Sequence, residues 1–175
     1  MRGMIKVLKH VYRKFMICFF NLFSGMHFFG IKRRILNLIP NISVGEKTKI
    51  VGPIWAGSVS EIVIGNNTFI NRQFAVEGNG RIIIGNNVDL GPGVKVLTGG
   101  HEIGEENHRA GDGKLYSINI DDGCWVGAYS IILGNTCIKK GCVVGAGTIV
   151  NKDTLENTLI VGKSGSIKKE IKDVR

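Results

Sequence analysis

Residues 120–150 read IDDGCWVGAYSIILGNTCIKKGCVVGAGTIV, and a branched aliphatic residue stands at every sixth position of this stretch. These residues are Ile120, Val126, Ile132, Ile138, Val144 and Val150. The same spacing occurs earlier in the chain, at Ile64, Ile70 and Val76 and again at Ile84, Leu90 and Val96. A six-residue period is typical of a β-helix and fits neither an α-helix nor an alternating strand. The chain is therefore predicted to be all-β, a parallel β-helix with three hexads in each coil.

Small or slender side chains occupy a second inward position, four residues after the aliphatic residues, and Phe74 is the one bulky exception. Cys124 and Cys142 both hold this position, so they are expected on one face in adjacent coils. A disulfide and a pair of reduced thiols both fit this geometry. The thiols are favoured because cytosolic cysteines stay reduced. No spacing among the four cysteines resembles a zinc site.

The net charge of +9 is concentrated at the N-terminus. Residues 1–45 contain eight of the 23 Lys and Arg residues and none of the 14 Asp and Glu residues. Apolar residues recur there at helical spacing, so residues 1–40 are predicted to form a basic amphipathic arm. Such a helix suits the cytoplasmic face of a membrane, and packing on the prism or between subunits is an equal alternative. Nucleic acid is not expected as a partner, because no recognition motif accompanies the charge.

The order of segments follows from these patterns. The arm is expected to include a second short helix at Ile31–Ile39 and to end at Pro40. The β-helix then occupies residues 41–162, interrupted by a loop at about residues 98–117. Residues 163–175 form the C-terminal tail, in which Ser166–Arg175 has a lysine-rich pattern that predicts a short helix capping the open end of the coil.

The interruption of the six-residue period is the best candidate for a functional segment. The period stops after Val96 and resumes near Ile120. The loop between them reads TGGHEIGEENHR from Thr98 and holds His101 and His108, two of the four histidines of the chain. A histidine near the root of a loop on a rigid scaffold is suited to act as a general base, because its unperturbed pKa lies near neutrality.

Four segments together resemble the galactoside and maltose O-acetyltransferases, which are hexapeptide-repeat acyltransferases with a left-handed parallel β-helix. The segments are Val94–His101, Tyr116, Trp125–Ala128 and Gly145–Asp153, within a similarity that covers about residues 60–172. The resemblance implies an acetyl-CoA-dependent O-acetyltransferase that acts on a sugar hydroxyl. It also implies that His101 is the catalytic base, which takes the hydroxyl proton as the oxygen attacks the thioester. His108 does not match that position.

The resemblance also implies the binding residues. Asn71 and Gln73 align with two acceptor-binding asparagines of the family, and Gln73 departs from that pattern. The implied contacts to acetyl-CoA are Leu115, Trp125, Ala128, Ala146, Asn151, Lys152 and Lys169. The two alanines would use backbone groups and the lysines would meet the nucleotide end, where phosphates favour cations. The Val-Pro-x-Arg motif of the family is replaced by Lys163-Ser164-Gly165-Ser166, so nucleotide contacts there are expected to differ.

The same resemblance implies a homotrimer with active sites between neighbouring prisms, and no metal. Because the basic arm replaces the acceptor-binding helices of maltose-type enzymes, we expect a surface polysaccharide or another glycan as acceptor. The protein is expected in the cytoplasm or on the inner membrane face. N-acetylation of an amino-sugar and a catalytically inactive β-helical scaffold stay open as alternatives. The three-histidine zinc site of γ-type carbonic anhydrases is not expected, because only His101 and His108 lie in the coil region.

Overall fold

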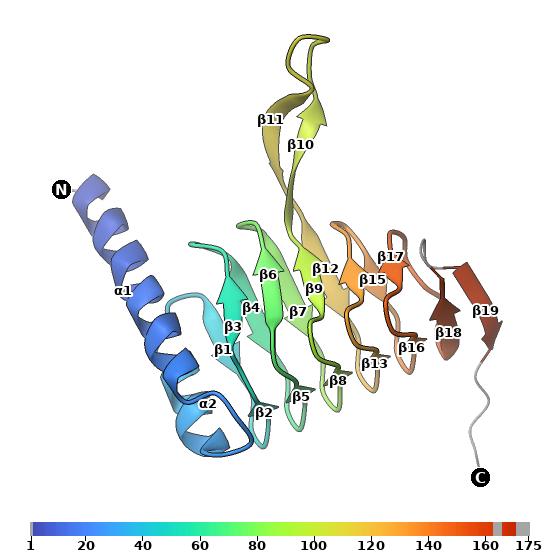
Figure 1. Cartoon of the computed structure of the whole chain (residues 1–175), viewed down its shortest axis with the longest axis horizontal. Coiled ribbons are helices and arrows are strands. Elements are labelled where there is room, and N and C mark those ends of the chain that lie inside the picture. Colours follow the sequence, from blue (N-terminus) through green and yellow to red (C-terminus); the bar gives the residue numbers. More distant parts are fainter. Residues whose placement is uncertain (1, 163–165, 171–175) are drawn as a thin grey trace.

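The computed structural model describes residues 2–162 and 166–170. Its body is a parallel β-helix of about six turns, with two helices across the first coil and a hairpin that projects from the middle (Figure 1). The prediction of a parallel β-helix with an N-terminal helical arm is confirmed.

The prism has three faces, each formed by parallel strands that the chain visits in the order A, B, C from β1 to β17, apart from the hairpin. Sheet A consists of β1 (Ile42–Val44), β4 (Glu61–Ile64), β7 (Arg81–Ile84), β12 (Ser117–Ile120) and β15 (Cys137–Ile138). Sheet B consists of β2 (Lys49–Ile50), β5 (Phe69–Ile70), β8 (Asp89–Leu90), β13 (Trp125–Val126), β16 (Val143–Val144), β18 (Thr158–Val161) and the antiparallel β19 (Ser166–Glu170). Sheet C consists of β3 (Ile54–Ala56), β6 (Phe74–Glu77), β9 (Lys95–Leu97), β14 (Ile131–Ile132) and β17 (Ile149–Val150).

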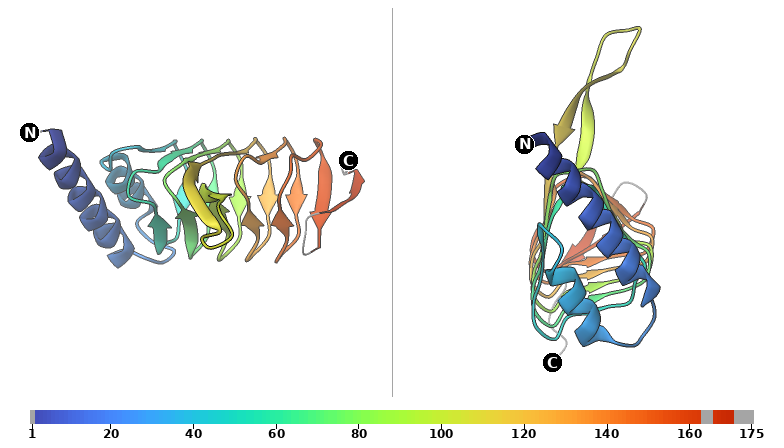
Figure 2. Two further views of the ribbon diagram at one scale, coloured as in Figure 1. Left: turned by 90° about the horizontal axis from the view of Figure 1, so that it is seen from above. Right: turned by 90° about the vertical axis from the view of Figure 1, so that its left-hand side faces the viewer.

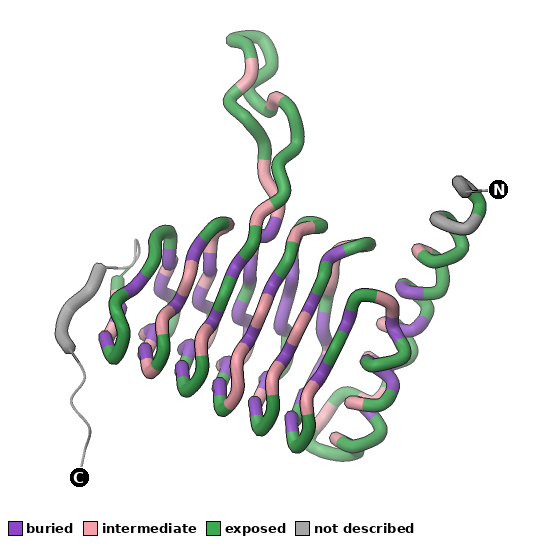
Figure 3. Tube along the Cα trace, turned by 180° about the vertical axis from the view of Figure 1, so that it is seen from behind, coloured by how far each residue is buried: buried purple, intermediate pink, exposed green. Residues whose placement is uncertain are grey.

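The core is a set of aliphatic columns that run along the prism. In sheet B, for example, Ile70 pairs with Leu90, Leu90 with Val126, and Val126 with Val144, and all four are buried. Figure 3 shows the resulting alternation of buried and exposed residues in each coil. Because every sixth residue points inward, the coils stack into one continuous apolar core, which is the main source of stability.

Cys124 and Cys142 are buried in this core as free thiols, as predicted. The Cys124 Sγ donates to the carbonyl of Lys139 at 3.1 Å. Burial raises the pKa of the Cys124 thiol to about 12. The two cysteines therefore fill inward positions as small uncharged side chains.

The predicted loop is a hairpin. Strands β10 (Gly99–Ile103) and β11 (Ala110–Leu115) pair antiparallel and stand away from the prism (Figures 1 and 2). The period fails here because neither strand contributes to the core, so no inward aliphatic position is needed.

The N-terminal arm consists of α1 (Arg2–Leu22) and α2 (Phe29–Asn37), which lie across the open end of the first coil (Figure 2). Met16 and Phe20 of α1 and Leu36 of α2 join the core cluster. The alternative that the arm packs on the prism is thus confirmed for one face of α1. No helix among the described residues is long and apolar enough to cross a membrane.

Polar side chains of the arm bond backbone groups that have no preceding coil to pair with. The Asn21 amide accepts from the Ile54 N–H and donates to the Ile54 carbonyl, both at 2.9 Å. The Asn37 amide likewise accepts from the Val44 N–H at 2.7 Å and donates to the Val44 carbonyl at 3.0 Å. Each amide thus replaces one residue of a missing strand, which avoids unpaired backbone groups at a buried edge.

Two cations of the arm are also structural. Buried Lys32 donates from Nζ to the carbonyls of Gly25 at 2.6 Å and Val51 at 3.0 Å. Buried Arg13 donates to the carbonyls of Gly57 and Ser60, each at 3.0 Å. Burial lowers the pKa of both groups. Their charges belong to the cap of the first coil and not to a ligand surface.

The predicted C-terminal helix is wrong for the part that the structure describes. Residues 166–170 form β19, which pairs antiparallel with β18, so that Leu159 lies opposite Lys169. The last coil would otherwise leave an open edge of N–H and C=O groups, and this strand covers it. Residues 163–165 and 171–175 lie outside the described residues.

Candidate active site

His101 lies on β10 and has a defined tautomer. Its Nδ1 is 2.8 Å from the carbonyl oxygen of Gly111, on the opposite strand of the hairpin. A carbonyl can only accept, so Nδ1 must carry the proton of the neutral ring. Nε2 then has a free lone pair, which is the state that a general base requires.

Thr98 anchors the root of this hairpin to the preceding coil. Its buried hydroxyl donates to the Glu77 carbonyl at 3.0 Å and accepts from the Gly80 N–H at 3.2 Å. Its carbonyl accepts from the N–H of Tyr116 at 2.9 Å, where the second strand returns. Both strands are therefore fixed where they leave the prism, and His101 lies three residues beyond the anchor.

Tyr116 braces the hairpin through close contacts with two glycines. A Cβ added at Gly134 would lie 2.1 Å from the Tyr116 ring, and one added at Gly100 would lie 2.9 Å from it. Glycine is thus required at both positions for the ring to lie between the hairpin and the next coil. Sequence reasoning matched Tyr116 to the family but missed this role and that of Thr98. The glycines gave no distinct signal in so glycine-rich a chain.

A groove of about 610 Å³ runs along the edge between sheets B and C. It is lined by Phe69, Asn71, Asp89, Leu90, Gly91, Pro92, Trp125, Gly127, Ala128, Val143, Val144, Gly145 and Ala146. Trp125 stands outward on β13, between Asp89 and Val143 of the neighbouring strands. The predicted residues Trp125, Ala128, Ala146 and Asn71 thus lie together.

Glycines let the coils approach closely along the groove. A Cβ at Gly91 would lie 2.6 Å from the Ala128 nitrogen, and one at Gly127 would lie 2.5 Å from the Ala146 nitrogen. Within the described residues, no backbone hydrogen bond uses the N–H of Ala128 or Ala146. Two backbone donors therefore line the groove without a backbone acceptor, which suits the amide carbonyls of the pantetheine arm of coenzyme A.

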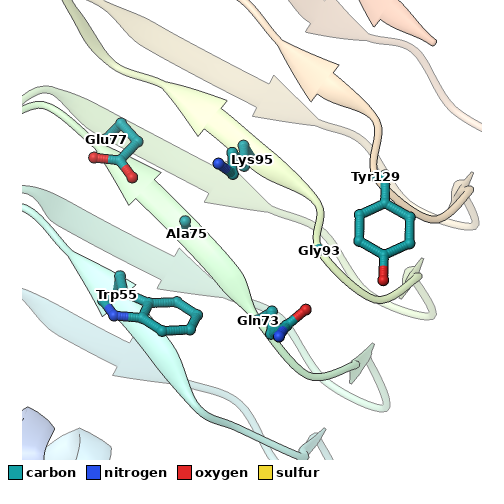
Figure 4. A pocket seen from close by; sticks show the side chains of 7 residues that line it. All are labelled: Trp55, Gln73, Ala75, Glu77, Gly93, Lys95 and Tyr129. Atoms are coloured by element: carbon teal, nitrogen blue, oxygen red, sulfur yellow. The ribbon is translucent and has the colours of Figure 1, made fainter. Parts of the chain in front are cut away.

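A second hollow, of about 410 Å³, lies on the outer face of sheet C (Figure 4). Its walls are formed by Trp55, Gln73, Ala75, Glu77, Gly93, Lys95 and Tyr129. In Figure 4, Trp55, Ala75 and Lys95 form one row across the strands, Gln73 and Tyr129 lie toward one end of the hollow, and Glu77 lies toward the other. The two predicted acceptor residues are thus divided, with Gln73 in this hollow and Asn71 in the groove.

The hairpin and the groove lie at different edges of the prism. The hairpin leaves after β9 of sheet C and returns into β12 of sheet A, which places His101 and Leu115 at the C–A edge. The groove follows β8 and β13 of sheet B, at the B–C edge. Sheet C separates them, so one chain does not bring His101 to Trp125.

The other predicted cofactor residues are divided in the same way. Asn151 and Lys152 follow β17 of sheet C, and the Thr154 N–H then donates to Cys137 of sheet A at 3.0 Å. They therefore lie at the C–A edge and are exposed. Lys169 belongs to β19 of sheet B, and its side chain lies outside the described part of the chain. In the described residues, no group of three or more His, Cys, Asp or Glu is arranged to hold a metal ion.

Known acetyltransferases are similar to this chain in sequence and in fold. No protein-family model matches the chain. Galactoside O-acetyltransferase of Escherichia coli (strain K12) is 30% identical over 131 residues, which are 75% of this chain. The match spans 64% of that relative, less than two thirds of its length.

Two solved structures are similar over nearly the whole chain. A hexapeptide-repeat acetyltransferase of Vibrio cholerae O1 biovar eltor, in complex with acetyl coenzyme A, has a TM-score of 0.82 at 23% identity and covers 95% of this chain and 88% of its own. A maltose O-acetyltransferase of Clostridium difficile 630 has a TM-score of 0.69 at 25% identity, and the match covers 97% of this chain and 89% of that one. Together with the hexad period, these similarities show that the chain has the β-helix fold of the hexapeptide-repeat acetyltransferases.

Proposed function

We propose that this protein is an acetyl-CoA-dependent O-acetyltransferase that acts on a sugar hydroxyl. The hydrogen bond from His101 Nδ1 to the Gly111 carbonyl carries this proposal, because it leaves Nε2 as a proton acceptor. Nε2 takes the proton of the acceptor hydroxyl as the oxygen attacks, and returns it to the leaving sulfur. A positioned base of this kind contributes about 10²- to 10⁴-fold to the rate.

The groove at the B–C edge is the proposed donor site. When bound, acetyl-CoA supplies the acetyl group, whose C–S bond breaks as the new C–O bond forms. The N–H groups of Ala128 and Ala146 bond the pantetheine arm, and Trp125 packs beside it. Leu115, Asn151 and Lys152 lie at the C–A edge, so they would reach this donor from a neighbouring copy, with Lys152 beside the phosphates of the nucleotide end, where cations are favoured. Lys169, on β19 of sheet B, is the second cation proposed for these phosphates.

The hollow on sheet C is the proposed acceptor site. Trp55 and Tyr129 are exposed aromatic residues that can stack on the C–H faces of a sugar ring. Gln73 lies between them with donors and acceptors for hydroxyl groups (Figure 4). Asn71 lines the groove. A sugar within a surface polysaccharide or another glycan fits this combination. The relatives named galactoside and maltose acetyltransferases support this substrate class.

The proposed assembly is a homotrimer with composite sites. The separation of the C–A and B–C edges within one chain supports it, because a neighbouring copy can bring its hairpin to the groove. His101 of one subunit then acts on the donor held by the next. We place the reaction in the cytoplasm, where acetyl-CoA is available.

The test is acetyl-CoA turnover by the purified full-length protein with free sugars, nucleotide sugars and oligosaccharides. His101→Asn is the key variant, because the Asn amide can still donate to the Gly111 carbonyl but has no basic nitrogen. We expect kcat to fall by about 10²-fold or more. His108→Asn, at the other hairpin histidine, is the matched control and should retain activity.

Undiminished turnover by His101→Asn would contradict the mechanism. Turnover of amino-sugars with no turnover of any hydroxyl acceptor would replace the proposed O-acetylation by N-acetylation. Absence of acetyl-CoA binding would favour an inactive scaffold.

A further inference from the structure

The outer face of α1 is apolar and uncovered. Met4, Leu8, Val11, Phe15, Cys18 and Leu22 follow one another at alternating spacings of four and three residues, which places them in one stripe. The large side chains of this stripe are well exposed, with 70% of Leu8, 65% of Phe15 and 77% of Leu22 accessible. Arg13, Met16 and Phe20 lie on the opposite face and are buried against the prism. The stripe therefore contributes nothing to the fold of the single chain.

An aromatic ladder extends this face beyond the helix. The ring of Phe19 lies 6.4 Å from that of Phe15 and 5.2 Å from that of Phe23. Phe28, in the turn before α2, follows at 6.4 Å from Phe23 and is exposed, as is Met26. The apolar face is thus continuous from α1 into this turn. It is a larger patch than the single apolar residues that are scattered over ordinary protein surfaces.

The charges around this face have one sign. Residues 1–45 contain no acidic residue, and Arg13 and Lys32 are withdrawn into the cap. Lys14 and Arg34 are exposed on α1 and α2. Two copies of this face placed against each other would bring cations together, which disfavours a symmetric dimer here. An anionic surface is complementary to it.

We propose that the outer face of the arm binds the surface of an anionic phospholipid bilayer. The stripe enters the boundary between headgroups and acyl chains, and the exposed cations meet lipid phosphates. The arm caps the first coil, whereas the hairpin rises from the middle of the prism (Figure 1). The bilayer would therefore lie at the end of the prism that carries the arm. The proposal concerns binding alone and does not depend on the acetyl-transfer activity.

The test is flotation of the full-length protein with phosphatidylcholine vesicles, with and without phosphatidylglycerol. We expect binding only when phosphatidylglycerol is present. Leu8→Gln combined with Leu22→Gln should weaken vesicle binding by about tenfold or more, because two apolar side chains are then no longer transferred from water into the bilayer. Leu155→Gln is the matched control, since Leu155 is 66% exposed at the other end of the prism, and it should bind as the parent does.

A second pair of variants tests the charge. Lys14→Gln and Arg34→Gln should each weaken binding to anionic vesicles by about fivefold, and added salt should weaken binding of the parent. Circular dichroism checks that each variant keeps its helices. A folded Leu8→Gln/Leu22→Gln variant that floats as the parent does would overturn the proposal. The proposal would also be overturned if the parent protein does not float and the double variant has a lower oligomer mass in sedimentation equilibrium. The face would then join copies of this chain.

Discussion

The two edges that flank sheet C are built from the same hexad repeat but present different chemistry. The C–A edge carries a side chain, His101, on a hairpin that leaves the prism and is anchored by Thr98. The B–C edge carries the backbone N–H groups of Ala128 and Ala146, next to glycines that let the coils approach closely. One edge should therefore be sensitive to the loss of functional groups, and the other to the addition of a single methyl group.

The largest effect outside His101 is expected at the B–C edge. Gly127→Ala adds a Cβ where only 2.5 Å separates it from the Ala146 nitrogen, so the coils must move apart. We expect a loss of stability of about 3 kcal/mol, similar to severe overpacking, and a raised KM for acetyl-CoA. Thermal unfolding and steady-state kinetics measure both.

Gly30→Ala is the control for that experiment. A Cβ at Gly30 meets nothing within 4 Å, and the residue lies in α2. Alanine should raise stability there by up to about 1 kcal/mol, because it favours a helix more than glycine does. If Gly127→Ala proves as stable as Gly30→Ala, the close approach of the coils does not constrain the groove.

A smaller effect is expected at the root of the hairpin. Thr98→Val removes the hydroxyl that bonds Glu77 and Gly80, so the hairpin loses part of its anchor. We expect kcat to fall by about tenfold, corresponding to a loss of about 1.4 kcal/mol in positioning, with little change in KM for acetyl-CoA.

Thr48→Val is matched to Thr98→Val, because the Thr48 hydroxyl is also buried and donates to Gly65 at 2.7 Å while accepting from the Thr68 N–H at 3.1 Å. It should lower stability by about 1–3 kcal/mol, as Thr98→Val does, without lowering kcat. Equal kcat losses in the two variants would mean that Thr98 acts through stability alone.

The last prediction concerns the reactivity of the buried cysteines of the core. Burial raises the pKa of Cys124 to about 12, so its thiol is protonated and unreactive at pH 8. Exposed Cys18 should react at once with a thiol reagent, and Cys124 only after unfolding. Rapid labelling of Cys124 in the folded protein would show that the coil opens there.

The sequence predicted those features that depend on the period. Val126 and Val144 had to point inward, and His101 stood out because the period stops before it. The hairpin was not predictable, because Gly99 and Gly100 carry no strand alternation and its pairing depends on contacts across the ribbon. The prediction of a C-terminal helix was wrong because it rested on the local lysine pattern. The unpaired edge of β18 provides backbone hydrogen-bond partners, and residues 166–170 pair with it as a strand.

The arrangement of the site was less predictable than its members. A six-residue period tells which side chains point inward, but not at which edge a segment leaves the prism. Leu115 and Trp125 were both expected beside the pantetheine arm, and the chain places them at different edges. Likewise Lys32 was counted among the cations of the basic arm, and the structure shows that it bonds carbonyls in the cap.

The central claim is that each active site combines the hairpin of one chain with the groove of another. The most direct test assembles His101→Asn and Trp125→Ala chains, each inactive alone at low acetyl-CoA concentration, into mixed oligomers. If the sites are composite, about a quarter of them in an equal mixture receive both intact residues, and about a quarter of the parental activity should return. Mixed oligomers that show no activity above the separate variants would contradict the account, because every site would then lie within a single chain.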